Sequence, residues 1–170
     1  MATHRIPLFG FNTLPDTSGN IFFEPFPIKA TNDRWDHGNF VFNDTSTEIA
    51  VFGTFNIPKN YTTTTAPRIV VVWTATPSTG TIVWDFNYRA VGGDNSESLD
   101  QAGTQEALSV SDSAPTAGFN RMEAYLTLTA ANLVADDTVE FDLTRDGSNA
   151  SDTLAVAGLL FNLLFEYVDA

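Results

Sequence analysis

An alternating run of side chains near the middle of the sequence constrains the fold more than any other feature. In residues 82–91 large apolar side chains alternate mainly with polar ones, which is the period of a strand with one buried face. The preceding residues 69–76 are β-branched and apolar on both faces, as in an interior strand. Between them Pro77 pre-sets its own φ and Gly80 tolerates a positive one. Residues 68–91 are therefore predicted to form two strands joined by a tight turn.

Each of these two strands contains a tryptophan, Trp73 in the first and Trp84 in the second. We expect the two rings to meet near the centre of one sheet, where aromatic neighbours on adjacent strands stabilise by roughly 0.2–1 kcal/mol per pair. No side chain in this stretch has the character of a catalyst, so we interpret it as scaffold.

The rest of the chain predicts further short strands separated by polar loops. We expect them at residues 21–29, 39–43, 48–57, 106–111, 119–130, 138–144 and 153–168. No segment shows convincing helical periodicity, although residues 131–137 could hold one helical turn. The pattern predicts an all-β protein, an antiparallel β-sandwich of eight or nine strands and most simply a jelly roll. An immunoglobulin-like sandwich is the alternative, but the chain lacks its Cys-Trp-Cys core.

A length of 170 residues suits one domain, and the first residues differ from the rest. Residues 1–20 have no steady period but carry four large apolar side chains, and residues 21–170 are predicted to be one β-sandwich domain. The apolar residues are Leu8, Phe9, Phe11 and Leu14. We expect this segment to be an arm lying along its own surface or a partner's; an ordinary first strand followed by a loop is the alternative.

The last predicted strand, at residues 153–168, is apolar on both faces. A sandwich strand normally wets one face, so the second face needs a cover. We expect an oligomer interface here, with residues 1–20 as the alternative cover within one chain. The predicted interface residues are Phe161, Leu163, Phe165 and Tyr167.

Composition narrows the partners and the chemistry. The net charge is −13, from 21 acidic and 8 basic residues, so nucleic acid and anionic membranes are repelled and neither is a predicted partner. The chain has no Cys, which excludes disulfides, a thiolate nucleophile and Cys-based zinc sites. No apolar run is long enough for a signal peptide or a membrane span, so synthesis inside the cell is expected.

The sequence does not predict an enzyme. His4 and His37 are its only histidines, and neither accompanies a G-x-S-x-G or an H-E-x-x-H motif. Asp85 and Glu123, on polar-facing strand positions, are the best candidates for a glycosidase-type carboxylate pair, but nothing in the sequence singles them out.

No metal and no cofactor are predicted either. Residues 136–137 and 146–152 place carboxylates on loops, yet neither has the spacing of an EF-hand calcium site. Trp35 is the one tryptophan in a predicted loop, beside His37, and it is the candidate for stacking against a sugar ligand.

Three segments resemble small jelly-roll proteins of tailed bacteriophages, the capsid decoration (cement) proteins and related virion modules. The segments are FNIPKNY at 55–61, IVVVW at 69–73 leading to WDFNY at 84–88, and DTVEFDLTRD at 137–146 leading to the final strand. The resemblance spans residues 50–168 and consists of a pattern of strands and turns.

This resemblance implies a structural protein of the virion. It implies a homotrimer on the capsid exterior that binds the major capsid protein through the arm and the last strand, with no catalytic residues. A tail or baseplate module that binds a host glycan is the alternative, and a polysaccharide-cleaving enzyme is a further one. The first two differ in copy number per particle, and the third requires a working carboxylate pair.

Overall fold

The computed structural model describes residues 1–8, 12–13, 40–44, 46, 50–93, 97–100 and 105–169, and nearly every element in them is a strand. One 3₁₀ turn, Ala130–Asn132, interrupts them, and within the described ranges no helix is long and apolar enough to cross a membrane. The strands are β1 (Thr3–Leu8), β2 (Asn12–Thr13), β3 (Phe40–Phe42), β4 (Ala50–Asn56), β5 (Arg68–Thr74), β6 (Thr81–Val91), β7 (Glu106–Ser113), β8 (Met122–Thr127), β9 (Thr138–Arg145) and β10 (Gly158–Val168).

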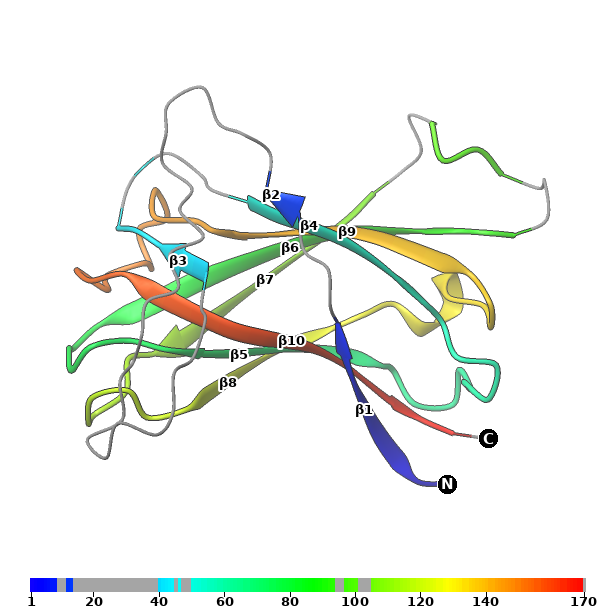
Figure 1. Ribbon diagram of the computed structural model, residues 1–170, viewed down its shortest axis with the longest axis horizontal. Coiled ribbons are helices and arrows are strands. Elements are labelled where there is room, and N and C mark those ends of the chain that lie inside the picture. The colour runs from blue at the N-terminus through cyan, green and yellow to red at the C-terminus, as the bar shows by residue number, and fades with distance from the viewer. Residues whose placement is uncertain are drawn as a thin grey trace.

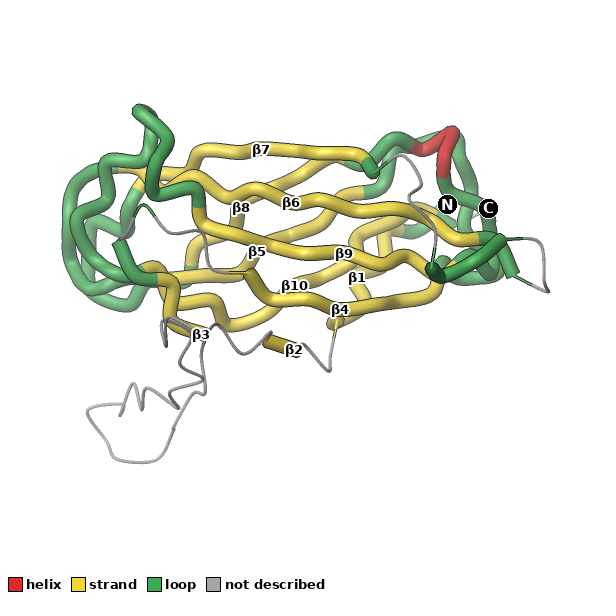
Figure 2. Tube along the Cα trace, turned by 90° about the horizontal axis from the view of Figure 1, so that it is seen from above, coloured by secondary structure: helices red, strands yellow, loops and turns green. Residues whose placement is uncertain are grey.

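These strands form two antiparallel sheets packed face to face (Figure 1). Sheet A has the order β1-β10-β5-β8, with β3 pairing with the first residues of β10. Sheet B has the order β2-β4-β9-β6-β7, and Figure 2 looks onto it, with sheet A behind. The predicted antiparallel β-sandwich is confirmed, and the chain termini lie side by side at one end of it.

The core fills the space between the sheets with alternate residues of the strands. In β6 the predicted inward set Ile82, Trp84, Phe86 and Tyr88 is almost fully buried, while Asp85, Asn87 and Arg89 between them are half-buried on the other face. Each large apolar side chain moved from water to such a core stabilises the fold by roughly 1.5–3 kcal/mol. The alternation of residues along β6 therefore determines which side chains lie on the outer face of sheet B, where they can contact a ligand.

The strands β5 and β6 are not a hairpin, which corrects the prediction for residues 68–91. β5 lies in sheet A and β6 in sheet B, so residues 75–80 carry the chain from one sheet to the other. Trp73 and Trp84 do meet, edge to face with ring centres 6.0 Å apart, but across the sandwich instead of within one sheet. The turn chemistry was recognised correctly, since Gly80 has a φ of +113°.

The described part of the predicted arm belongs to the sandwich. Residues Thr3–Leu8 form the edge strand β1, which pairs with β10 in a continuous register from Thr3↔Val168 to Leu8↔Leu163. Leu8 is buried in the core with 3% of its surface exposed, and not displayed for a capsid. Residues Thr3–Leu8 therefore form an ordinary first strand, which was the alternative to the predicted arm. Phe9, Phe11 and Leu14 lie outside the described residues, as do the predicted strand at 21–29, Trp35 and His37.

Three of the four predicted interface residues are core residues of the chain itself. Leu163, Phe165 and Tyr167 point between the sheets and are at most 6% exposed, so they are not available at a surface. Their burial follows from the position of β10, which lies between β1 and β5 in sheet A. Phe161, which is half-buried, packs against a separate cluster of Val70, Val72 and Leu164.

A buried arginine fixes the segment that precedes β10. Arg145, at the end of β9, is 2% exposed and its guanidinium binds both carboxylate oxygens of Asp152, at 2.7 and 2.9 Å. It also donates to the backbone carbonyls of Val156 and Leu154. This explains why the last strand begins at Gly158 and not at residue 153: the intervening residues wrap around the arginine.

Candidate functional site on the outer face of sheet B

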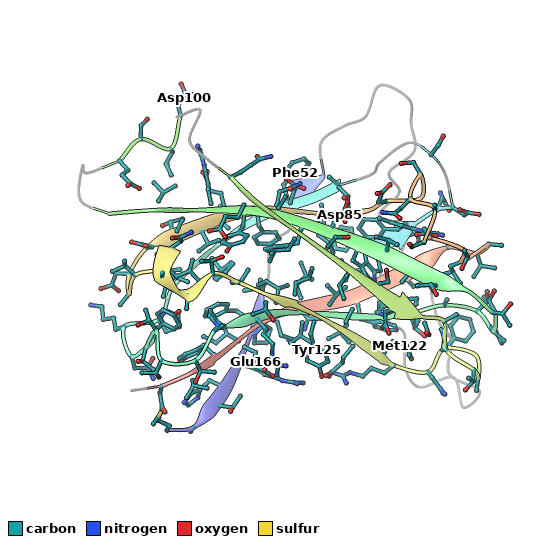
Figure 3. The ribbon with its side chains drawn as sticks, turned by 180° about the vertical axis from the view of Figure 1, so that it is seen from behind. Phe52, Asp85, Asp100, Met122, Tyr125 and Glu166 are labelled. Atoms are coloured by element: carbon teal, nitrogen blue, oxygen red, sulfur yellow. The ribbon has the colours of Figure 1, made fainter. Side chains whose placement is uncertain are left out.

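The outer face of sheet B is built from the strand residues that point away from the core. Antiparallel register places Phe52 of β4, Asp142 of β9 and Asn87 of β6 in one row across three strands. The next row along the strands contains Glu140 of β9 and Arg89 of β6. Figure 3 shows Phe52 on the side of sheet B turned away from sheet A. An aromatic side chain is thus flanked by planar polar groups on an open sheet.

These two rows enclose a shallow depression of about 160 Å³. Its lining residues are Phe52, Asn87, Tyr88, Arg89, Gln105, Glu140, Phe141 and Asp142. Tyr88 and Phe141 direct their rings into the core, where they are almost fully buried, so the polar side chains and Phe52 supply the chemistry of the depression.

Hydrogen bonds between neighbouring strands hold the polar groups in place. Asn87 Nδ2 donates to Asp142 Oδ1 at 2.9 Å, and Arg89 Nε donates to Glu140 Oε2 at 2.6 Å. Arg89 also donates to the backbone carbonyl of Leu99, which ties the described segment 97–100 to this face. The side chains are therefore ordered before any ligand arrives, which lowers the entropic cost of binding.

The carboxyl groups on this face repel one another. Burial raises the pKa of Asp142, the charge of nearby Asp85 raises it further, and the hydrogen bond from Asn87 opposes both effects. Asp85 Oδ1 is buried and has no hydrogen-bond partner among the residues that the structure describes. A buried acceptor without a donor is costly, so this oxygen is an unfavourable point in the polar network of this face.

The outer face of sheet A has a different character, because ion pairs cover it. Arg5 Nε lies 2.7 Å from Glu166 and its Nη1 lies 3.0 Å from Glu123, while Arg68 binds Glu166 and stacks over Tyr125 at 4.6 Å. A hydrogen bond from the Tyr125 hydroxyl, followed by those from the arginines, lowers the pKa of Glu123 to about 2 although burial opposes this. Figure 3 shows Tyr125 and Glu166 below sheet A.

The suggested carboxylate pair is ruled out by this arrangement. Asp85 lies on the outer face of sheet B and Glu123 on the outer face of sheet A, so the core separates them and they cannot act on one glycosidic bond. His4 sits at the edge strand β1, where its Nε2 lies 3.0 Å from Asp169, and it stacks on Tyr167.

The loop carboxylates considered for calcium have partners within the chain. Asp152 binds Arg145, and Asp146 accepts hydrogen bonds from Ser148 and Asn149. In the described part of the chain, no group of three or more His, Asp or Glu side chains is placed to hold a metal ion.

Sequence reasoning missed most residues of this face. Asn87, Arg89, Glu140 and Asp142 were on positions predicted to point outward from their strands, which is a usable signal. Their meeting depends on β6 pairing with β9, and strand order could not be derived from the alternation. Phe52, an apolar residue in an apolar segment, gave no sign of its outward position.

Two solved structures are similar to the chain at low sequence identity and low TM-score. The carbohydrate-binding module TmCBM61, solved with β-1,4-galactotriose, is 8% identical with a TM-score of 0.42, over 98% of this chain and 88% of that chain. The α-L-arabinofuranosidase MgGH51, solved with bound arabinose, is 12% identical with a TM-score of 0.43, over 95% of this chain. The match spans 23% of that enzyme's length. No protein-family model and no curated protein sequence match the chain.

Proposed function

We propose that this chain is a carbohydrate-binding module that holds a saccharide on the outer face of sheet B. The observation that carries the proposal is the row in which Phe52, Asp142 and Asn87 meet at one open depression. A sugar ring has an apolar C–H face and a rim of hydroxyls. An aromatic side chain bordered by amide and carboxylate groups matches both parts of it.

The size of the depression supports an extended ligand. Its volume of about 160 Å³ is below the roughly 300–1,000 Å³ of pockets that enclose a small molecule. Polar side chains continue along β6 from Arg89 to Asp85, beyond the depression. The proposed ligand is therefore a stretch of polysaccharide that extends from the depression along β6 and is open to solvent on its far side.

Polysaccharide binding by the purified chain tests this proposal. A panel of soluble polysaccharides is screened by affinity gel electrophoresis, and positives are measured by isothermal titration calorimetry. Phe52→Ala is expected to lower affinity at least tenfold. The matched control, Tyr125→Ala, removes a partly exposed ring from the opposite face and leaves affinity unchanged. Absence of binding to the whole panel, or equal affinity of Phe52→Ala and the parent chain, contradicts the proposal.

A role in a bacteriophage particle is our second proposal. It is supported by the difference between the two outer faces. On sheet A, Arg5, Arg68 and Arg121 form ion pairs with Glu123 and Glu166, whereas on sheet B one arginine, Arg89, stands among Asp85, Glu140 and Asp142 in the described strands. A protein that attaches to a particle through one face and meets solvent with the other needs two such unlike surfaces.

Quantitative mass spectrometry of purified particles tests the second proposal. A copy number near that of the major capsid protein supports a capsid decoration protein. A number far below it supports a tail or baseplate module that binds host glycan through sheet B. Absence from particles overturns the virion role.

A further inference from the structure

The outer face of sheet B carries an excess of negative charge. Three carboxyl groups, those of Asp85, Glu140 and Asp142, face this side, and among the described strand residues there Arg89 supplies the only guanidinium. Arg89 is bonded to Glu140 at 2.6 Å, so its charge is balanced within the face. Asp85 and Asp142 stand in neighbouring rows of the sheet, so their two negative charges repel each other.

Among the charged and amide groups of this face, hydrogen-bond acceptors outnumber the donors that remain free. Asn87 uses one N–H to bind Asp142, and Arg89 directs its N–H groups to Glu140 and to the carbonyl of Leu99. Carboxylates only accept, and this face carries the carboxylates of Asp85, Glu140 and Asp142. A ligand that satisfies this surface must bring donors, as sugar hydroxyls do. Ligand carboxylates or sulfates would bring more acceptors and more negative charge.

We infer that the saccharide bound by the outer face of sheet B is neutral and hydroxyl-rich, and that this face rejects uronic-acid and sulfated polymers. The inference rests on the proposed carbohydrate-binding function and names the ligand class of that site. Asp85 has the defining role in it: its carboxylate accepts from a ligand hydroxyl and repels a ligand anion.

The test compares matched neutral and acidic polymers on the intact chain. Galactan is set against polygalacturonate, and a β-glucan against polyglucuronate, by isothermal titration calorimetry at low and high salt. At low salt, each neutral polymer is expected to bind at least tenfold more tightly than its acidic counterpart. This difference in affinity is expected to become smaller at high salt, because salt screens the repulsion between the face and the acidic polymer. The binding that is seen is expected to depend on Phe52.

Asp85→Asn isolates the role of the charge, because it keeps the shape of the side chain. The variant is expected to bind the neutral polymer about three- to tenfold more weakly and to narrow the low-salt gap to the acidic one. Glu123→Gln, which removes a carboxylate from the outer face of sheet A, is the matched control and leaves both affinities unchanged. Near-UV circular dichroism verifies that each variant is folded.

The outcomes separate this inference from the function on which it rests. Polygalacturonate binding that equals galactan binding and is lost in Phe52→Ala overturns the neutral-ligand inference but leaves the carbohydrate-binding function standing. Lack of binding to every polymer overturns both. If the acidic polymer still binds to Phe52→Ala but not to Arg121→Ala, it binds to sheet A and not to sheet B. Combined with binding of the neutral polymer that depends on Phe52, this result supports the inference.

Discussion

Gly80 occupies a backbone position that a side chain cannot share. Its φ is +113°, and a Cβ built there would lie 2.4 Å from the backbone carbonyl oxygen of Thr153. The carbonyl belongs to the backbone, which cannot rotate away as a flexible side chain can. Residues 75–80 can therefore cross between the sheets only with glycine at this point.

Replacing Gly80 by Ala is expected to destabilise the protein by about 2–4 kcal/mol, from positive-φ strain together with the steric overlap. Urea unfolding followed by circular dichroism measures the change as a lower midpoint at constant slope. Gly93→Ala is the matched control, because nothing lies within 4 Å of a Cβ at that position and its φ is not in the left-handed region. Equal midpoints for the two variants would contradict the argument.

Glu123 links stability to pH through its lowered pKa. The value falls from the usual 4.5 to about 2 in the folded chain, so the carboxylate stabilises the fold above pH 4.5. That contribution, on the order of 3 kcal/mol, is lost as pH falls from 4.5 towards 2. Glu123→Gln is expected to be less stable than the parent at pH 7 and to approach it in acid.

Thermal unfolding from pH 2 to pH 7 measures this dependence. Tyr125→Phe provides a second variant, since it removes the hydroxyl that contributes most to the low pKa and keeps the ring beneath Arg68. Its loss of stability in acid is expected to be smaller and to level off at a higher pH, because the folded-state pKa of Glu123 rises towards 4.5. Parallel stability curves for Glu123→Gln and the parent would refute the assignment.

At the scale of whole elements, Arg145 connects strands that the backbone ladders do not. Its guanidinium joins β9 to the carbonyl of Phe42 at the end of β3, to Asp152 and to the residues before β10. Asp152, whose side chain is 1% exposed, also accepts from the backbone N–H of Val83. One buried ion pair thus fixes the loop between the last two strands against both sheets.

Replacing only one partner of the Arg145–Asp152 ion pair is expected to lower the free energy of unfolding more than replacing both partners. Arg145→Met leaves Asp152 charged and buried, with an expected loss of about 3–5 kcal/mol. The double variant Arg145→Met, Asp152→Asn is expected to recover part of that loss, and a double-mutant cycle in urea yields the coupling. Arg121→Met is the control at an exposed ion pair, where less than about 1 kcal/mol is expected. A purely additive cycle would show that the pair is not coupled.

The elements themselves were largely predictable, whereas their partners were not. Alternation placed the strands at 82–91 and 138–144 almost correctly, because which residues avoid water is a local property. Pro77 and Gly80 mark a reversal of the chain, but a turn within one sheet and a crossing between two sheets use the same residues. The fold class followed from the pattern, and the candidate site did not, because it exists only through the pairing of β6 with β9.

Considered as a whole molecule, the sandwich depends on β10 more than on any other strand of sheet A. β10 pairs with β1 and β3 on one side and with β5 on the other, and its inward residues are in the core. A chain that stops at residue 157 is therefore expected to lack a cooperative unfolding transition by circular dichroism and calorimetry.

A circular permutant is the control for the shortened chain, because it moves the chain ends but keeps every strand. The termini lie side by side, so a short flexible linker can join them, and new ends can be opened at the exposed loop residues Thr63 and Thr64 (Figure 1). This chain keeps β10 in its interior and is expected to unfold cooperatively. Cooperative unfolding of the shortened chain would contradict the central role of β10.

The late position of β10 also has a consequence for how the protein is made. A ribosome delivers β1 and β5 long before the strand that pairs with both of them, so sheet A cannot close until β10 has emerged. Until then the edge of β5 that pairs with β10 is open, although β8 can already pair with its other edge. An open strand edge is where neighbouring nascent chains associate and chaperones bind. The yield of folded protein is therefore expected to depend on what protects the chain in the interval before β10 is available.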